Sequence, residues 1–190
     1  SAGLLAFMIG VGSLPQVILL LKKMSIGQMI QSDGPAHHEK SNTPTMAGLW
    51  LIMLWIGVSV FWLDVWNPYQ AIPVFVAVGF MLLGLIDDLA KILHKDNNLG
   101  LSVRMKFFGQ FVLAGIAVSW WMSSVNHSAV TVIQFPPFFF GGGGIDIGWF
   151  YPVFAVLVIV GSSNSVNLTD GLDGLVSVPT ILVALGLMLA

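Results

Sequence analysis

The chain has 190 residues, of which 56% are apolar and only 8% are charged. Soluble domains carry roughly 25% charged residues, so this chain lacks the polar surface that a soluble globule needs. The composition also excludes a disordered chain and a nucleic-acid-binding protein that depends on a basic surface. Because there is no cysteine, disulfides, thiolate metal sites and cysteine nucleophiles are excluded as well. These numbers indicate an integral membrane protein.

Six apolar segments have about the 20 residues that a membrane-spanning helix needs, or nearly so. They are Gly3–Leu21, Thr45–Leu63, Ala71–Ile86, Phe107–Met122, Phe150–Val166 and Gly174–Ala190. The predicted fold is therefore an all-α integral membrane protein, a polytopic helical bundle that forms one transmembrane domain over residues 1–190. Because the chain begins without Met and stops inside an apolar segment, we expect it to be part of a longer polypeptide.

The basic residues predict how this bundle is oriented. All seven lie in the first or third connection: Lys22, Lys23, Lys40, Lys91, Lys95, Arg104 and Lys106. The second and fourth connections, residues 64–70 and 123–148, contain none. Because an excess of Lys and Arg marks cytoplasmic loops, residues 22–42, 87–106 and, by alternation, 161–173 are predicted to be cytoplasmic.

The outer connection 123–148 has the composition of a small periplasmic β-hairpin. Residues 130–135 are rich in β-branched residues and are typical of a strand. Pro136, Pro137 and the glycines at 141–144 are typical of a turn. A loose apolar loop is the alternative, and neither structure suggests a chemical role.

Acids also gather on the predicted cytoplasmic side, in three polar clusters. The first cluster, residues 33–48, contains Thr43 and Pro44, which have the composition of a helix N-cap and first helical position. With Lys40 nearby, this helix N-terminus would attract an anion. The alternative is a capped helix with a polar segment before it.

The second cluster is the acidic pair Asp87-Asp88, directly after an apolar run. Two adjacent carboxylates repel each other there, and together they suit a hard cation such as Mg²⁺, with Lys91, Lys95 and Lys106 as phosphate partners. The alternative is a helical ion pair between Asp87 and Lys91, four residues apart, while Asp88 faces water.

The third cluster contains Asn167, Asp170 and Asp173, which recur every third residue, and a glycine directly follows each of the two aspartates. One helical turn or a tight turn would bring their oxygens together, and the alternative is a loop of cap residues. Carboxylates, lysines and a helix N-terminus on one membrane face favour Mg²⁺-dependent phosphoryl transfer from a water-soluble donor to a lipid. The rival, an ion-coupled transporter, predicts charges near helix midpoints and repeated halves.

Three motifs resemble the phospho-N-acetylmuramoyl-pentapeptide transferase family. They are Thr43-Pro-Thr-Met46 after Lys40, Asp87-Asp88 with Lys91, and Asn167-Leu-Thr-Asp-Gly-Leu-Asp-Gly174. The resemblance covers the whole chain and implies that residues 1–190 are the N-terminal part of an enzyme with about ten membrane helices. The related polyprenyl-phosphate N-acetylglucosamine-1-phosphate transferases share the paired aspartates but differ at the other two motifs.

The resemblance implies a reaction and its participants. Undecaprenyl phosphate attacks UDP-N-acetylmuramoyl-pentapeptide at a bacterial inner membrane, giving lipid I and UMP with Mg²⁺ on the cytoplasmic side. By motif, the catalytic positions are Asp87, Asp88 and Lys106, with Asp87 as base or nucleophile. The substrate-binding positions are Lys40, Thr45, Lys91, Asn167, Asp170 and Asp173. Asp87 and Asp88 are also candidate metal ligands, the main metal-binding aspartate is expected beyond Ala190, and a homodimer is compatible with the family.

Overall fold

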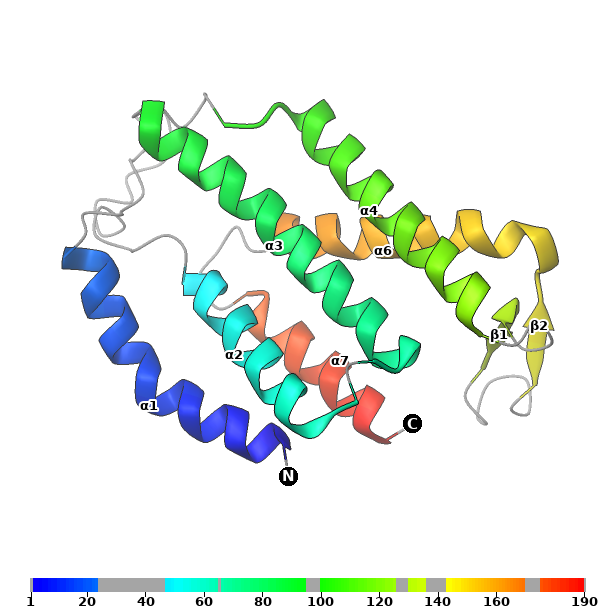
Figure 1. The fold of residues 1–190 in the computed structure, drawn as a ribbon, viewed down its shortest axis with the longest axis horizontal. Helices are drawn as coiled ribbons and strands as arrows, with labels where there is room; N and C mark the ends of the chain where they lie inside the picture. The colour runs from blue at the N-terminus through cyan, green and yellow to red at the C-terminus, as the bar shows by residue number, and fades with distance from the viewer. Residues whose placement is uncertain are drawn as a thin grey trace. The chain divides into compact units, whose positions relative to one another are not determined.

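The computed structural model describes residues 2–23, 47–64, 66–94, 100–125, 130–135, 143–169 and 175–189 (Figure 1). Within these residues the chain forms six α-helices, one 3-10 helix and a two-stranded hairpin. This mostly helical structure with a small hairpin agrees with the predicted fold class. The chain divides into two compact units, Ser1–Leu113 and Ala114–Ala190.

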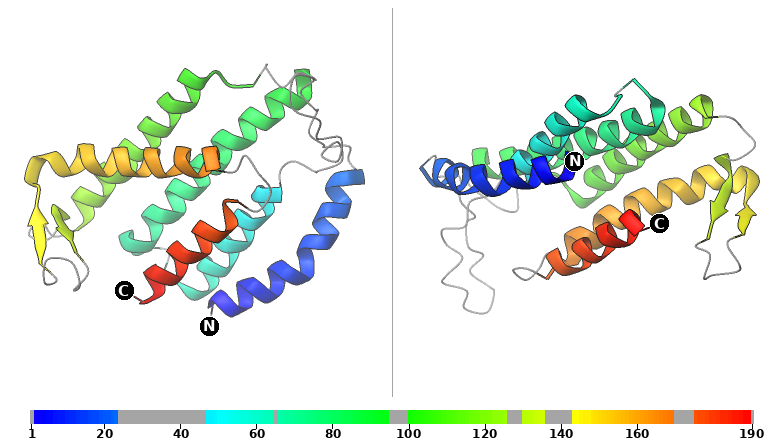
Figure 2. Two further views of the ribbon diagram at one scale, coloured as in Figure 1. Left: turned by 180° about the vertical axis from the view of Figure 1, so that it is seen from behind. Right: turned by 90° about the horizontal axis from the view of Figure 1, so that it is seen from below.

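The first unit is built from packed helices. They are α1 (Ala2–Lys23), α2 (Ala47–Trp62), α3 (Pro68–His94) and the first half of α4 (Val103–Ser124). Helix α2 packs against both α1 and α3, and it lies between them in Figure 1 and in the view from behind in Figure 2. A polar contact joins α1 to α2, because Nε1 of Trp50 donates to Oγ of Ser13 at 3.1 Å.

Helix α3 begins at a well-formed cap and ends later than its sequence predicts. Oδ1 of Asn67 accepts a hydrogen bond from the backbone N–H of Tyr69 at 3.0 Å, and Pro68 occupies the first helical position. The apolar run stops at Ile86, but the helix continues to His94. The acidic pair and Lys91 therefore lie on a helix rather than in a loop, where residues three and four apart can contact each other.

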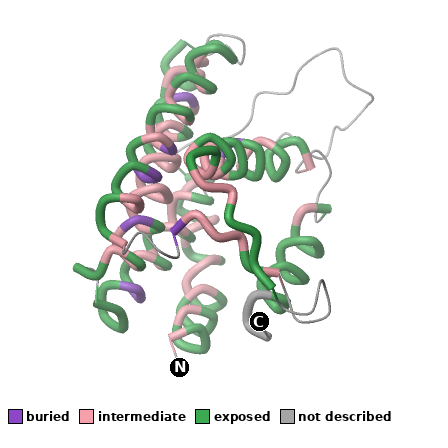
Figure 3. Tube along the Cα trace, turned by 90° about the vertical axis from the view of Figure 1, so that its right-hand side faces the viewer, coloured by how far each residue is buried: buried purple, intermediate pink, exposed green. Residues whose placement is uncertain are grey.

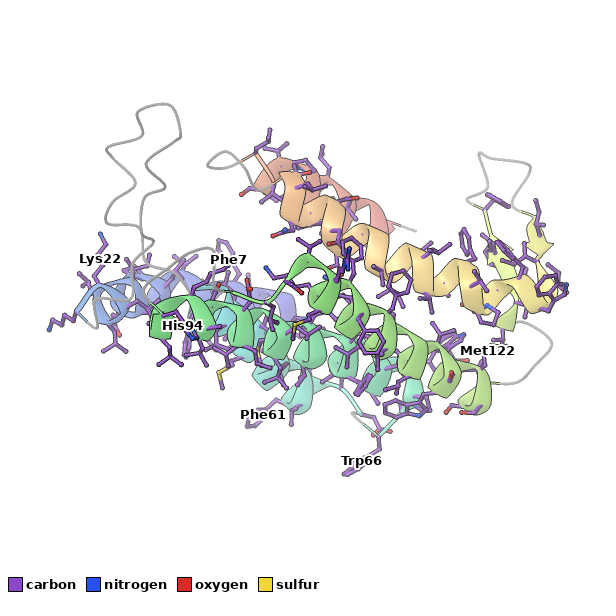
Figure 4. The ribbon with its side chains drawn as sticks, turned by 90° about the horizontal axis from the view of Figure 1, so that it is seen from above. Phe7, Lys22, Phe61, Trp66, His94 and Met122 are labelled. Carbon is purple, nitrogen blue, oxygen red and sulfur yellow. The ribbon has the colours of Figure 1, made fainter. Side chains whose placement is uncertain are left out.

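One end of the first unit carries its described basic side chains. The last turns of α1 and α3 and the first turn of α2 lie at the same end in Figure 1. Figure 4 shows Lys22 and His94 toward this end, whereas Trp66 lies away from it, in the turn between α2 and α3. Lys22 and Lys23 occupy the last turn of α1, and Lys91 the last turn of α3.

The apolar surface of the helices is largely exposed, as expected for helices that face lipid. Helices α1, α3 and α4 and the segment Gly148–Thr169 are long and apolar enough to cross a membrane, whereas α2 and α7 are shorter within the described residues. Figure 3 shows only short buried stretches along the helices. Phe61 and Trp66 are 89% and 90% exposed. This pattern supports the predicted membrane protein.

The second unit contains the rest of α4, the hairpin, a 3-10 helix and two further α-helices. They are β1 (Val132–Gln134), β2 (Gly144–Asp146), the 3-10 helix η3 (Gly148–Phe150), α6 (Tyr151–Thr169) and α7 (Ser177–Leu189). The strands pair antiparallel, with Ile133 opposite Ile145, which confirms the predicted hairpin. Gly148 has a φ of 50°, a conformation that favours glycine, where the hairpin passes into η3.

Candidate active site

The centre of the candidate site is Asp87, near the end of α3. Its side chain is 10% exposed, and two ammonium groups contact the same carboxylate oxygen. Nζ of Lys91 lies 2.6 Å from Oδ2, and Nζ of Lys106 lies 2.7 Å from it. The ion pair between Asp87 and Lys91 that the four-residue spacing predicts is therefore present, and Lys106 joins it from the first turns of α4.

The other oxygen of Asp87 is held by the backbone that leads into α4. The N–H of Leu101 donates to Oδ1 at 2.8 Å. Ser102 fixes this geometry as the N-cap of α4, because its Oγ accepts from the N–H of Met105 at 3.3 Å and its carbonyl accepts from the N–H of Lys106 at 3.0 Å. Both carboxylate oxygens of Asp87 are thus engaged by donors.

Asp88 has different surroundings, because adjacent residues on a helix point in different directions. Its side chain is 38% exposed, and its Oδ1 lies 3.7 Å from Nζ of Lys91, a longer ion pair than those of Asp87. Asp88 also lines a cavity of about 380 Å³ between α2 and α3, whose other walls include Leu49 and Ile52 of α2 and Phe80 of α3. The cavity is apolar except at Asp88.

The four charged side chains balance one another. The two aspartates offset Lys91 and Lys106, whose side chains are 31% and 39% exposed. A partly exposed ammonium group can exchange a carboxylate for a phosphate oxygen, because both are anionic acceptors. The cluster can therefore bind phosphate at one end of a membrane-length helix.

Of the two acids, Asp88 fits a Mg²⁺ ion better than Asp87 does. Mg²⁺ takes oxygen ligands, commonly one or two carboxylates together with substrate phosphates. The oxygens of Asp87 already accept from an N–H and two ammonium groups, whereas Asp88 has one longer contact with Lys91. Within the described ranges, no group of three or more His, Asp or Glu side chains is close enough to hold a metal ion.

The remaining predicted site residues are not among the described members of the cluster around Asp87. Lys40, Thr45, Asp170 and Asp173 lie outside the described residues, as does Lys95. Asn167 is exposed near the end of α6, in the second unit. The helix continues past the predicted boundary at Val166, so Asn167 is helical rather than part of a loop.

Gly100 and the backbone of Leu101 also shape the surroundings of Asp87, and the sequence gives little sign of either. Neither residue type suggests chemistry, and the donor of Leu101 is a backbone N–H that every residue except proline has. The only signal is position, since both lie between the acidic pair and the Lys106 that joins it.

The helices and this cluster define a membrane protein whose ion-paired carboxylates and lysines suit phosphoryl transfer. A family model described as glycosyl transferase family 4 matches residues 70–190. The chain belongs to this family.

Comparison with curated proteins confirms the resemblance read from the motifs. Over 167 residues the chain is 42% identical to a phospho-N-acetylmuramoyl-pentapeptide-transferase of Oleidesulfovibrio alaskensis, covering 88% of the chain and 45% of that relative. Proteins of the same name from Borrelia turicatae and Borrelia garinii subsp. bavariensis are each 41% identical over 177 residues, covering 92% of the chain and 49% of each relative. The chain thus spans about half the length of these relatives.

Proposed function

We propose that the chain is part of a Mg²⁺-dependent enzyme that transfers phospho-N-acetylmuramoyl-pentapeptide from UDP to undecaprenyl phosphate, releasing lipid I and UMP. The observation that carries the proposal is the cluster of Asp87, Asp88, Lys91 and Lys106 at one end of a membrane-length helix. The names of the similar proteins supply the transferred group, and the motif resemblance to the family supplies its donor and its lipid acceptor. Neither a transporter nor the N-acetylglucosamine-1-phosphate enzyme has a specific observation in its favour.

The chemistry is a displacement at phosphorus. An oxygen of the lipid phosphate forms a bond to the sugar-linked phosphorus of the UDP-sugar, and the bond from that phosphorus to the bridging oxygen breaks, so UMP leaves with the electron pair. The second pKa of a phosphate monoester is about 6, so the lipid phosphate is largely dianionic at neutral pH and needs little help from a base. Positioning and neutralisation of negative charge then dominate the rate.

The geometry favours a positioning role for Asp87 over the role of base or nucleophile that the family resemblance implies. Its two oxygens accept from the N–H of Leu101 and from Lys91 and Lys106. A nucleophile would have to lose these donors before it could attack. Asp87 instead holds the two ammonium groups together, ready to meet phosphate oxygens, which supports direct attack by the lipid phosphate.

Asp88 is the residue of this cluster that would contact the metal. When bound, Mg²⁺ supplies neutralisation of phosphate charge and orientation of the donor. The carboxylate of Asp88 is partly exposed and also lines the apolar cavity. It therefore lies between the charged cluster and a cavity whose walls suit a lipid chain. Lys91 contacts both acids and so fixes the position of the Asp88 carboxylate relative to Asp87 and its two ammonium partners.

The rest of the site completes the proposal by motif. Lys40, Thr45, Asn167, Asp170 and Asp173 bind the nucleotide sugar, and connections 22–42, 87–106 and 161–173 face the cytoplasm. The hairpin then lies on the outer side of a bacterial inner membrane. Residues 1–190 act as one transmembrane domain of a longer transferase, in which other segments supply the main metal ligand.

The test is UMP release by the purified full-length protein in lipid–detergent micelles. UMP should appear only when UDP-N-acetylmuramoyl-pentapeptide, undecaprenyl phosphate and Mg²⁺ are all present, and lipid I should form in equal amount. Replacing the donor with UDP-N-acetylglucosamine should abolish the reaction. Equal turnover of that donor, or UMP release that does not require the lipid, would contradict the proposal.

A further inference from the structure

The backbone that precedes α4 approaches Asp87 and Lys91 so closely that there is no room for a side chain at position 100. A Cβ atom built on Gly100 would lie 2.5 Å from Oδ1 of Asp87 and 2.8 Å from Cε of Lys91. Both distances are shorter than ordinary van der Waals contact. The requirement for glycine here concerns space, because a Cβ atom would meet side-chain atoms of Asp87 and Lys91.

We propose that Gly100 is a positioning residue of the acid–lysine cluster. Its missing side chain lets the segment 100–102 lie directly against Asp87, so the N–H of Leu101 reaches Oδ1 at 2.8 Å. Because α4 begins directly after this segment, the position of the segment also brings Nζ of Lys106 to within 2.7 Å of Oδ2 of Asp87. Gly100 thus acts through Asp87, Lys91 and Lys106, and its effect on activity rests on the transferase function proposed above.

A second crowded glycine in the same pair of helices shows why Gly100 differs from a packing glycine. A Cβ atom on Gly109 of α4 would lie 2.8 Å from Cδ2 of Leu83, the end of a flexible apolar side chain. Leu83 can move by rotating its side chain, and no charge is involved. At Gly100 the nearest atom belongs to a carboxylate held by three donors, so a methyl group there must displace the backbone or the ion pairs.

The experiment compares Gly100→Ala with two matched variants in the full-length protein. Gly109→Ala adds the same methyl group at a site of similar crowding, and Gly115→Ala adds it where nothing lies within 4 Å. Each variant is assayed for kcat and for KM of the nucleotide sugar. Amide hydrogen exchange at Leu101 and the thermal unfolding midpoint are measured on the same preparations.

Gly100→Ala should lower kcat by about tenfold to a hundredfold, because a displacement of about 1 Å in a catalytic group costs up to that much. The KM of the nucleotide sugar should change by no more than about twofold, since an interaction made mainly in the transition state affects kcat rather than KM. Exchange at Leu101 should accelerate in Gly100→Ala and stay at the wild-type rate in Gly109→Ala and Gly115→Ala.

Either of two activity results would overturn the positioning role. One is a kcat for Gly100→Ala that equals that of Gly115→Ala. The other is a loss of activity that Gly109→Ala shares and that follows the unfolding midpoint, because Gly100 would then serve only packing. If the wild-type protein released no UMP, the proposed transferase function would be wrong. The positioning role has a separate test, because unchanged hydrogen exchange at Leu101 in Gly100→Ala would refute the contact on which it rests.

Discussion

Lys106 and Asp87 are separated by 19 positions in the sequence, yet Nζ of Lys106 lies 2.7 Å from Oδ2 of Asp87. The contact joins the start of α4 to the end of α3. Asp87 is buried, whereas the side chain of Lys106 is partly exposed. The ammonium group of this ion pair is therefore more accessible to solvent than the carboxylate. An anionic substrate would therefore meet the ammonium group of Lys106 before it meets the carboxylate of Asp87.

Substitution of Lys106 should affect turnover more than stability. Lys106→Met is expected to lower kcat by about tenfold to a hundredfold, because a cation positioned for the phosphate is lost. The free energy of unfolding should fall by about 1 kcal/mol, since Lys91 and Leu101 still engage Asp87. UMP release and thermal unfolding measure the two effects.

The matched control for that change is Arg104→Met, which removes a basic side chain from the same turn of α4. Arg104 is exposed. Arg104→Met should leave kcat within about twofold of wild type, because single surface charges contribute little. An equal loss in both variants would assign the effect to the general positive charge of this end and not to the contact with Asp87.

The predicted orientation can be tested by labelling single cysteines, since the chain has none of its own. Cysteines at Asn98 or Ser41 should react only with a reagent applied to the cytoplasmic side. Cysteines at Asn67 or Asn126 should react only from the outside, because the connections that contain them have no basic residue. Labelling of Asn98→Cys from the outside would reverse the orientation and remove the site from the cytoplasm.

The hairpin contains a carboxylate whose titration is testable. The Thr131 hydroxyl donates to Oδ1 of Asp146 at 2.6 Å, and together with the N–H of Gly148 it holds the pKa of Asp146 below its usual value. A depressed pKa in the folded state favours folding at pH values above the unfolded pKa, and this contribution is lost as the pH falls through the folded pKa. The hairpin should therefore loosen in acid.

Thr131→Val should raise the pKa of Asp146 toward its ordinary value, because the hydroxyl donor contributes most to the lowering. The titration can be followed by NMR of a carboxyl-labelled aspartate at position 146. Thr180→Val is the control, since the Thr180 hydroxyl donates to the carbonyl of Val176 within the α7 region. A titration of Asp146 that is the same in all three proteins would show that Thr131 does not hold it.

The helical class and the acidic pair were predictable from the sequence, because apolar run length and the scarcity of charge are local signals. The end of α3 at His94 was not predictable, because the apolar pattern stops at Ile86 and the four-residue spacing of Asp87 and Lys91 left a helical continuation only as an alternative. The hairpin was one of two alternatives, since an apolar connection rich in proline and glycine also suits a loose loop, and the strands that form are only three residues long. The contacts of Lys106, Gly100 and Leu101 with Asp87 depend on how two helices pack, and no local pattern encodes that.

A double variant separates catalysis from simple charge balance. If Asp87 serves only to neutralise Lys91, then Lys91→Ala should restore activity to Asp87→Asn by removing the unpaired ammonium group. We expect no such recovery, because Lys106 would still lack its partner and the phosphate would have lost a cation. Turnover of Asp87→Asn with and without Lys91→Ala measures this directly, and recovery to wild-type turnover would reduce the cluster to a structural ion pair.

Turnover of the full-length protein carrying Asp87→Asn or Asp88→Asn is the most direct test that this cluster is the catalytic centre. Each substitution should lower kcat for UMP release by about a hundredfold or more, because stabilisation of the charge that develops in the transition state usually contributes most to such rate enhancements. Both variants should remain folded, and Asp88→Asn should also need more Mg²⁺ for half-maximal activity. Wild-type kcat and an unchanged Mg²⁺ requirement in both variants would show that phosphoryl transfer takes place elsewhere in the protein.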